Sequence, residues 1–198
     1  MKIISKIFVI ISLAIIVFIS YLGFKIFFKS NTTFEDNFVY FYVKSGSSSE
    51  DLINSISNYI TDIDTFTKAA KTKKYLENIK AGRFKLNKGD NNNNIINSLR
   101  SKNIPVKVTF NNIQTIQELS GYISNKIEAD SISLINSFTN KDFLKNLNLT
   151  SDSVLSLFLP NTYEFFWNTS ADDFREKMVK EFNICLLYTS PSPRDLRA

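Results

Sequence analysis

The hydrophobic residues of this chain form one uninterrupted run, which is followed by a series of short periodic segments. Residues 7–24 contain no charged side chain, and an apolar run of this length can cross a bilayer as a helix. We therefore predict a transmembrane anchor over residues 7–28. Because Lys2 and Lys6 precede the run, residues 1–6 are expected in the cytoplasm and the bulk of the chain in the periplasm, as in a single-pass inner-membrane protein. A cleaved signal peptide is the alternative, but its apolar region would be shorter and a small-residue cleavage site would follow.

A strand and helix pattern occurs twice after a polar linker, residues 29–38. Each copy has an alternating strand, a Gly turn, a polar helix start and an amphipathic helix. In the first copy, the strand and turn at residues 41–46 lead into the helix at residues 52–56. In the second copy, residues 84–89 lead in the same way into residues 95–99. A further helix is expected over residues 63–79, and the asparagine run 91–94 is expected to be a solvated turn and helix start. Residues 39–104 are thus predicted to form a small domain of mixed helix and strand.

Residues 105–184 are predicted to form a second domain, which is mainly helical at its start. Residues 104–110 alternate with a period of two and indicate a strand. A helix should follow, with Thr115 and Glu118 as a capping box and with Ile116 and Leu119 on its buried face. Later helices are expected at 131–138, 141–147, 151–157 and after Ser170. The predicted fold class is α+β.

Residues 157–170, with the sequence LFLPNTYEFFWNTS, concentrate aromatic side chains around one carboxylate, Glu164. Flat aromatic faces suit the C–H faces of pyranose rings, and amide and carboxyl groups can bind sugar hydroxyls. The alternative is structural: the aromatic rings belong to the core, Asn161 and Thr162 form a turn after Pro160, and Glu164 caps a helix or forms a salt bridge. The residues alone leave both interpretations open.

Composition excludes several kinds of chemistry. The chain carries a formal charge of +5, but the excess lies in the lysines that flank the apolar run and in the last residues, so nucleic acid is not an expected partner. There is no His and one Cys, Cys185, which excludes a Ser-His-Asp triad and a zinc site built from His and Cys. We expect no cofactor and no metal.

The segment LFLPNTYEFFWNTS resembles the signature segment of the endolytic murein transglycosylase family, in the form found in Bacteroidetes. The resemblance implies a membrane-anchored lyase that cuts the β-1,4 bond between N-acetylmuramic acid and N-acetylglucosamine in nascent peptidoglycan strands. It leaves 1,6-anhydro ends and so terminates strand elongation, near the peptidoglycan synthases that are its expected partners. By the same resemblance, Asn161, Thr162, Tyr163, Glu164 and Trp167 are expected to bind substrate or to brace the catalytic Glu.

The first strand, Gly turn and Ser-entered helix resemble a LysM module, and residues 81–89 are similar to the matching part of the LysM-like domain in the same family. LysM modules bind N-acetylglucosamine polymers, so residues 39–104 are expected to hold glycan near the membrane. A small spacer domain without affinity for glycan is the alternative. The resemblance further implies that residues 105–184 are the start of a mixed α/β transglycosylase domain.

No catalytic residue is assigned in this chain. In the family the catalytic Glu follows in a helix that reads roughly Ala-Ser-Ile-x-x-x-Glu, and residues 172–182 contain no such segment. Residues 185–198, CLLYTSPSPRDLRA, resemble translated sequencing-adapter read-through and are expected to be an artefact. A chain cut off in this way should be inactive, with Ile116, Leu119 and Phe174 lacking core partners.

Two other functions share parts of this pattern. A non-catalytic, membrane-tethered glycan-binding protein would need the LysM-like domain and no catalytic Glu. A membrane-anchored assembly factor with a POTRA-like repeat would need the strand and helix repeat but not residues 157–170.

Overall fold

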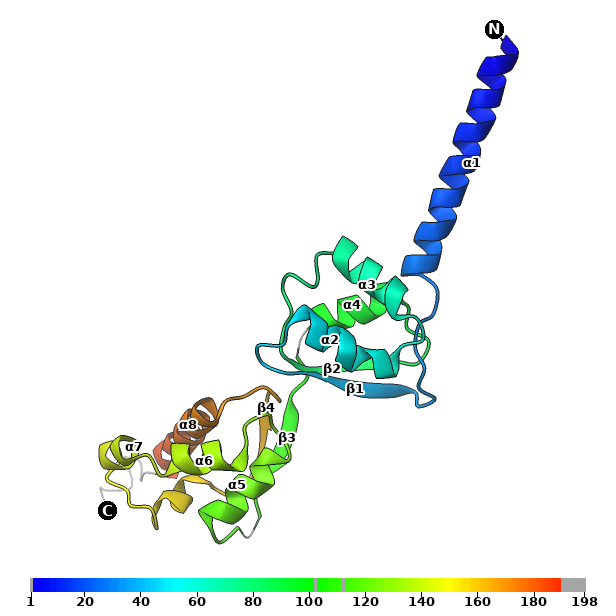
Figure 1. The fold of residues 1–198 in the computed structure, drawn as a ribbon. Helices are drawn as coiled ribbons and strands as arrows, with labels where there is room; N and C mark the ends of the chain where they lie inside the picture. Colours follow the sequence, from blue (N-terminus) through cyan, green and yellow to red (C-terminus); the bar gives the residue numbers. More distant parts are fainter. Residues whose placement is uncertain (1, 102, 112, 190–198) are drawn as a thin grey trace. The chain divides into compact units, whose positions relative to one another are not determined.

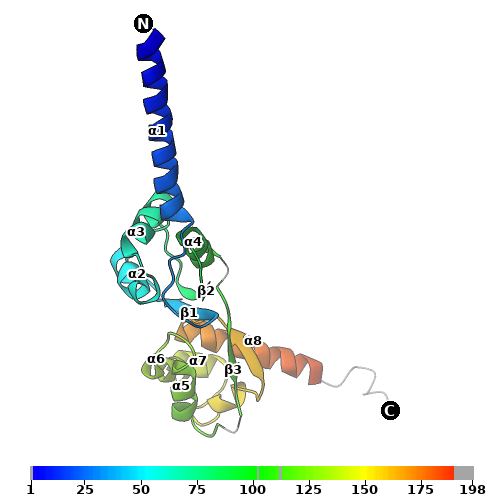
Figure 2. The same ribbon diagram turned by 90° about the vertical axis from the view of Figure 1, so that its right-hand side faces the viewer.

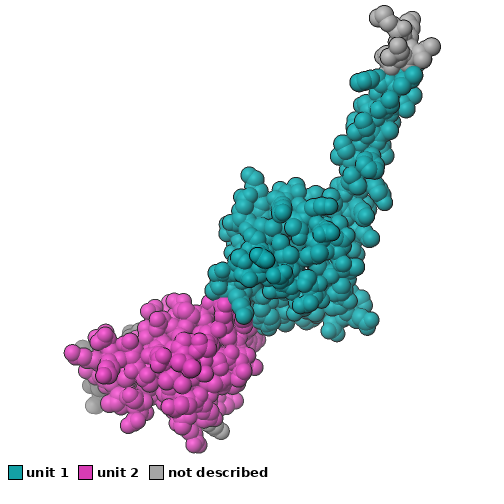
Figure 3. Space-filling model, viewed as in Figure 1, with its two compact units in different colours: residues 1–103 teal, residues 104–198 magenta. Residues whose placement is uncertain are grey.

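The computed structural model describes residues 2–101, 103–111 and 113–189 of the 198-residue chain. The fold is of mixed α+β class, as predicted, and divides into two compact units (Figure 3): unit 1, Met1–Asn103, and unit 2, Ile104–Ala198. The expected artefact over residues 185–198 lies outside the described residues from position 190 onward. Its first five residues continue the last helix of unit 2.

Helix α1 (Lys2–Phe27) contains the apolar run (Figure 1). In the described part of the chain, its segment Lys6–Phe27 is the one stretch of helix long and apolar enough to cross a membrane, which confirms the predicted helix. A signal sequence near an N-terminus would have the same properties. The last turn of α1 has a second role, because Ile26 and Phe27 pack against the hydrophobic core of unit 1.

Unit 1 is a two-stranded antiparallel sheet with helices on one face (Figures 1 and 2). Its elements after α1 are β1 (Phe38–Val43), α2 (Ser49–Ile56), the 3₁₀ turn η1 (Ser57–Tyr59), α3 (Ile63–Thr72), β2 (Gly82–Asn87) and α4 (Asn92–Arg100). Phe41 pairs with Phe84 across the two strands. Strand residues alternate in direction, so the even-spaced set Phe41, Val43, Phe84 and Leu86 is buried beneath the helices.

Both predicted strand and helix pairs are present, and side-chain caps start their helices. Ser48 and Asp51 form a capping box at α2, in which each side chain bonds the backbone N–H of the other residue. The Asn91 side chain caps α4 by accepting from the N–H of Asn94. Such caps satisfy backbone donors that a helix start leaves unpaired.

The prediction of one helix over residues 63–79 is wrong beyond Thr72. Lys74 has a φ of 54°, and the N–H of Tyr75 donates back to the carbonyl of Ala70 at 2.9 Å. This is the hydrogen-bond pattern of a Schellman motif, which ends a helix with a left-handed residue. The reversal places Tyr75 in the core, where its side chain is 1% exposed.

The prediction that residues 91–94 are solvated is wrong for Asn92, which is 1% exposed. Asn92 accepts a hydrogen bond from the Asn31 side chain at 2.7 Å and donates to the carbonyl of Ile26, also at 2.7 Å. Asn31, itself buried, bonds the carbonyl and the N–H of Asp62 through its amide group at 2.9 and 2.7 Å. The two amides therefore connect the end of α1 to the starts of α3 and α4.

The described residues of unit 2 form five helical segments, which pack against a second two-stranded antiparallel sheet. Its elements are β3 (Val106–Thr109), α5 (Ile116–Ser124), α6 (Ser131–Phe138), α7 (Lys141–Asn146), the 3₁₀ turn η2 (Val154–Leu157), β4 (Thr162–Phe165) and α8 (Ala171–Thr189). The helix expected over residues 151–157 is thus only a short 3₁₀ turn. Strand β4 was not predicted.

The expectation that Ile116, Leu119 and Phe174 lack partners is also wrong. Leu119 and Phe174 are fully buried and Ile116 is 7% exposed. All three belong to one hydrophobic cluster with both strands and helices α5, α6 and α8. The described part of unit 2 therefore has a closed core of its own.

We expect Asn92→Ala to lower the free energy of unfolding of unit 1 by about 1–3 kcal/mol, because it removes one of the hydrogen bonds of the buried Asn31 amide and the bond that Asn92 donates to the Ile26 carbonyl. Asn94→Ala is the matched control. It changes the same residue type in the same helix, but at an exposed position, and should have an effect within about 0.5 kcal/mol. Hydrogen exchange of the full chain in detergent, followed in peptides from residues 82–100, measures both. If both substitutions lowered the stability of unit 1 equally, Asn92 would not be a specific connection between α1 and the starts of α3 and α4.

Candidate functional site

The predicted site residues lie on β4 and on the segments directly before and after it. In the β3–β4 pair, Lys107 lies opposite Glu164 and Thr109 opposite Thr162, and Val108 lies opposite Tyr163. Because side chains alternate along a strand, the segment divides into two sets. Tyr163 and Phe165 are buried, whereas Thr162 and Glu164 are exposed.

The buried set belongs to an aromatic cluster in the core of unit 2. Phe165 stacks on Phe174 with ring centroids 4.1 Å apart and an interplanar angle of 17°. The hydroxyl of Tyr163 donates to the carbonyl of Leu159 at 3.0 Å, which fastens the turn before Pro160 to the strand. Burial raises the pKa of this hydroxyl, and the nearby Glu181 raises it further.

The exposed set and the residues opposite it on β3 form a polar strip, defined here as Lys107, Thr109, Thr162 and Glu164, in which Thr109 is half-buried. The hydroxyl oxygens of Thr109 and Thr162 are 2.9 Å apart and share a hydrogen bond. The strip therefore presents two hydroxyls, one ammonium and one carboxylate on neighbouring strands. Such groups can exchange hydrogen bonds with the hydroxyls and acetamides of a sugar.

A pocket of about 400 Å³ adjoins the carboxylate end of the strip. It is lined by Pro105, Glu164, Phe165, Phe166, Thr169, Asp173 and Lys177. The Lys177 ammonium donates to the backbone carbonyl of Glu164 and lies 4.7 Å from the centroid of the Phe165 ring. Phe166 is 52% exposed, so the pocket combines an open aromatic ring with charged groups of both signs.

Of the residues that line this pocket, only Glu164 was predicted as a site residue, and Phe166 and Lys177 are the most informative of those that were missed. Phe166 lies inside the aromatic segment, and its position one residue past the end of β4 is what exposes it. Lys177 lies on α8, and no local pattern links it to Glu164. The contact between Lys177 and Glu164 depends on the tertiary packing of α8 against β4, which the sequence alone does not show.

Asn161 and Trp167 flank the strand in structural positions. The Asn161 side chain accepts from the N–H of Thr162 at 2.7 Å, and its backbone carbonyl accepts from the N–H of Phe110 at 3.0 Å. Trp167 packs half-buried against the core, and its carbonyl accepts from the N–H of Glu128 at 2.7 Å. Both residues hold β4 to neighbouring segments.

Glu164 does not have the surroundings of a general acid for glycoside cleavage. Such an acid sits in an apolar pocket that favours its protonated form, whereas Glu164 is exposed on the strand. Within the residues that the structure describes, no cluster of three or more His, Cys, Asp or Glu side chains could hold a metal ion. The arrangement suits carbohydrate binding rather than bond cleavage.

We expect Tyr163→Phe to lower the free energy of unfolding of unit 2 by about 0.5–1.5 kcal/mol, through loss of the bond to Leu159. The raised pKa adds a pH dependence. The folded state keeps the hydroxyl protonated, so its contribution is present below the ordinary tyrosine pKa of about 10 and is lost as pH rises above it. The variant should therefore lose less stability than the wild type between about pH 8 and about pH 11.

Chemical unfolding followed by fluorescence isolates this effect, because Trp167 is the one tryptophan of the chain and lies in unit 2. Tyr122→Phe is the control. Tyr122 is half-buried against the same core, and Phe keeps the ring that faces Lys126. An equal loss of alkaline sensitivity in both variants would show that the Tyr163 hydroxyl is not its cause.

Comparison with known proteins agrees with the resemblance of residues 157–170. A search of curated proteins found no match. Among solved structures, the chain is similar to a yceG-like protein, lmo1499, of Listeria monocytogenes, with 18% sequence identity and a TM-score of 0.40. The similarity covers 78% of this chain and 57% of the Listeria chain, so this chain spans less than two thirds of that relative. Residues 41–192 match the sequence profile of the YceG-like family. This match covers most of the chain, which therefore belongs to the YceG-like family.

Proposed function

We propose that this chain is part of a membrane-anchored peptidoglycan lytic transglycosylase that cuts nascent glycan strands internally. The observation that carries the proposal is the YceG-like match over residues 41–192, since that family is the endolytic transglycosylase family which residues 157–170 resemble. The exposed polar strip and the pocket beside Phe166 support it, because together they offer what a glycan strand requires.

The proposed reaction needs one carboxyl group and no water. As an acid, the carboxyl protonates the oxygen that leaves with N-acetylglucosamine. As a base, it then accepts the proton of the muramyl 6-hydroxyl, whose oxygen bonds to C1 and closes the 1,6-anhydro ring. We place this carboxyl outside residues 1–184, in the helix that carries the catalytic Glu in the family.

The residues of this chain would then either bind the glycan or hold the binding strand in position. Thr162 and Glu164 of the polar strip would bond sugar hydroxyls, and the exposed ring of Phe166 would meet a pyranose face. Asn161, Tyr163 and Trp167 would keep β4 in position through their contacts with Phe110, Leu159 and Glu128. Catalysis by this chain alone is not expected.

Unit 1 would hold the glycan in a LysM-like manner. A pocket of about 430 Å³ lies where β1 ends and α2 begins. It is lined by Phe41, Tyr42, Val43, Lys44, Ser45, Gly46, Ser47, Asp51, Leu52, Asn54 and Ser55. These are the segments of the LysM-like pattern, and an aromatic ring beside several short polar side chains suits an acetylated sugar.

We place α1 in the inner membrane, with the short N-terminal segment in the cytoplasm and both units in the periplasm. The support is the apolar length of Lys6–Phe27 and the lysines that precede it. Nascent strands emerge at this membrane surface, so peptidoglycan synthases are the proposed protein partners.

The product of the complete reading frame tests the proposed reaction. Expressed in full and incubated with uncrosslinked peptidoglycan, it should release muropeptides with 1,6-anhydro ends, seen by mass spectrometry. The 198-residue chain is the matched control, and it should bind peptidoglycan without releasing product. Reducing ends instead of anhydro ends would contradict a lyase. Binding without any cleavage by the full product would favour the non-catalytic glycan-binding protein.

Glu164→Gln in the complete product separates substrate binding from catalysis. Loss of one hydrogen bond to a sugar should lower kcat/KM by about tenfold or less, since 1.4 kcal/mol corresponds to a factor of ten. Removing a general acid would cost far more, about 10²–10⁴-fold. Asp152→Asn, an exposed carboxylate of the same unit, should leave the rate unchanged. A thousandfold loss for Glu164→Gln would identify Glu164 as the catalytic group.

A further inference from the structure

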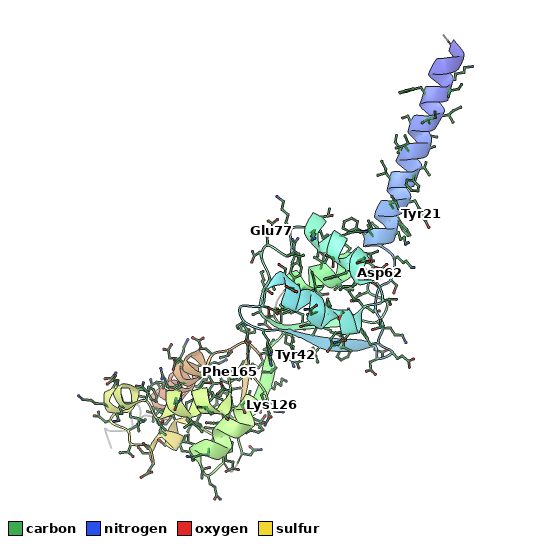
Figure 4. All side chains as sticks on the ribbon, in the orientation of Figure 1. Tyr21, Tyr42, Asp62, Glu77, Lys126 and Phe165 are labelled. Carbon is green, nitrogen blue, oxygen red and sulfur yellow. The ribbon has the colours of Figure 1, made fainter. Side chains whose placement is uncertain are left out.

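The part of unit 1 that lies nearest to the end of α1 is rich in lysine and has no role in the sites described above. Helices α3 and α4 pack against α1, and both ribbon views show α3 beside the end of α1, on the opposite side of the unit from the sheet (Figures 1 and 2). Figure 4 labels Tyr21 near this end of α1 and Asp62 at the start of α3. We call this region the α3 basic surface and define it by Lys25, Lys29, Lys68 and Lys71.

The end of the apolar run has the residue types of a membrane interface. Tyr21 and Lys25 are one turn apart on α1, and Lys29 follows two residues after the helix ends. All three side chains are exposed. Tyrosine is enriched where a membrane meets water, and lysine extends its charged end to the interface from an apolar helix. This end of α1 therefore suits the boundary between lipid tails and headgroups.

The lysines of α1 and those of α3 form one continuous surface. Lys25 and Lys29 line a small pocket together with Asp62 and Thr65 from the first turn of α3. Lys68 comes three residues after Thr65, and Lys71 three residues after that. Residues three apart are neighbours on a helix surface, so the row of lysines runs from α1 along α3.

The four lysines are not used by the fold itself. Helix α3 buries Phe66, Ala69 and Ala70, whereas Lys68 and Lys71 are exposed on the side away from these residues. Among residues 2–101, which the structure describes, no side chain forms an ion pair or hydrogen bond with any of the four ammonium groups.

Positive charge predominates on this surface. Asp64 is the one exposed acidic residue of α3, and the carboxylate of Asp62 accepts from the N–H of Thr65 as the cap of the helix. Exposed lysines on a helix are often only solvated, so their charge alone does not identify a partner. Their position relative to α1 does.

The chain has almost no slack between the apolar run and unit 1. Lys6–Phe27 has 22 residues, about 33 Å at the helical rise of about 1.5 Å per residue, which matches a hydrocarbon layer of about 30 Å. Phe27 already packs against the core of unit 1, and Asn31 is buried in it. If α1 crosses the bilayer, α3 therefore lies at the headgroups, a layer about 5–7 Å thick on each side.

We propose that the α3 basic surface binds the phosphate headgroups of anionic lipids in the membrane that α1 crosses. An ammonium group pairs with a phosphate as a compact point charge, and lysines close to an anionic lipid surface are attracted to it. The proposal rests on the placement of α1 in the proposed function, but it concerns lipid rather than glycan. The contact would hold unit 1 against the bilayer in one orientation.

The test places the full chain in two kinds of lipid nanodisc, one of phosphatidylcholine and one in which phosphatidylglycerol is added. A water-soluble reagent acetylates the exposed lysines, and mass spectrometry gives the rate at each position. Lys68 and Lys71 should react about fivefold more slowly in the anionic discs, as expected for a lysine close to an anionic surface. Lys44 and Lys85, which are exposed at the sheet, should change by less than about twofold. Higher salt should remove the protection.

Two doubly substituted forms show whether these lysines make the contact. In anionic discs, Lys68→Gln with Lys71→Gln should raise the hydrogen exchange of peptides from residues 62–76 to the rate seen in neutral discs. Lys44→Gln with Lys85→Gln is the matched control and should leave that rate at the wild-type value. Circular dichroism should be the same for all forms, because the four side chains are exposed.

Other outcomes separate the claims. If alkaline carbonate extracts the wild type from both kinds of disc, α1 does not cross the bilayer, and the placement in the proposed function fails as well. If the chain stays inserted but Lys68 and Lys71 react equally fast in both discs, this inference alone fails. Equal protection of all four measured lysines would show a diffuse attraction and overturn the proposal. Inorganic phosphate that protects Lys68 and Lys71 in neutral discs as well as anionic lipid does would identify a site for free phosphate and would also overturn it.

Discussion

The buried amide pair Asn31–Asn92 is the contact on which the arrangement of unit 1 depends. Without it, the polar segment after α1 would be a tether, as its composition suggests. With it, the last turn of α1, the start of α3 and the start of α4 share one hydrogen-bonded network. Buried amides are costly unless they are fully bonded, so this network holds in one geometry. If α1 crosses the membrane, unit 1 is held at its surface.

The alternation along β4 explains why one short segment carries so many aromatic residues. Every second side chain enters the core, where Tyr163 and Phe165 contact Phe110 and Phe174. The residues between them remain free to meet a ligand. Residues 157–170 therefore supply both a rigid strand and two residues of the polar strip, Thr162 and Glu164. Under the proposed function, the structural and functional interpretations of the segment apply to different side chains within it.

Local patterns predicted most elements of the fold, because capping residues and hydrophobic period act over a few neighbours. The helix from Ser131 to Phe138 and the capping by Thr115 follow from such signals. The end of α3 was missed because a lysine, not a glycine, has the left-handed conformation at position 74. Strand β4 was missed because Phe165, Phe166 and Trp167 are all aromatic, which hides a period of two. The role of Asn92 depends on a partner 61 residues away, and no local pattern could reveal it.

Under the proposed function, glycan contacts in both units would give the enzyme a means of choosing where it cuts. A single contact beside the reacting bond would accept any position along a strand. A second contact on a covalently joined unit acts at a high effective concentration, but only for strands that can reach both. Short strands would gain nothing from it, whereas long strands would bind more tightly. Under the proposed function, the pocket at the end of β1 would favour cleavage of strands above a minimum length, and its loss would allow shorter strands to be cut equally well.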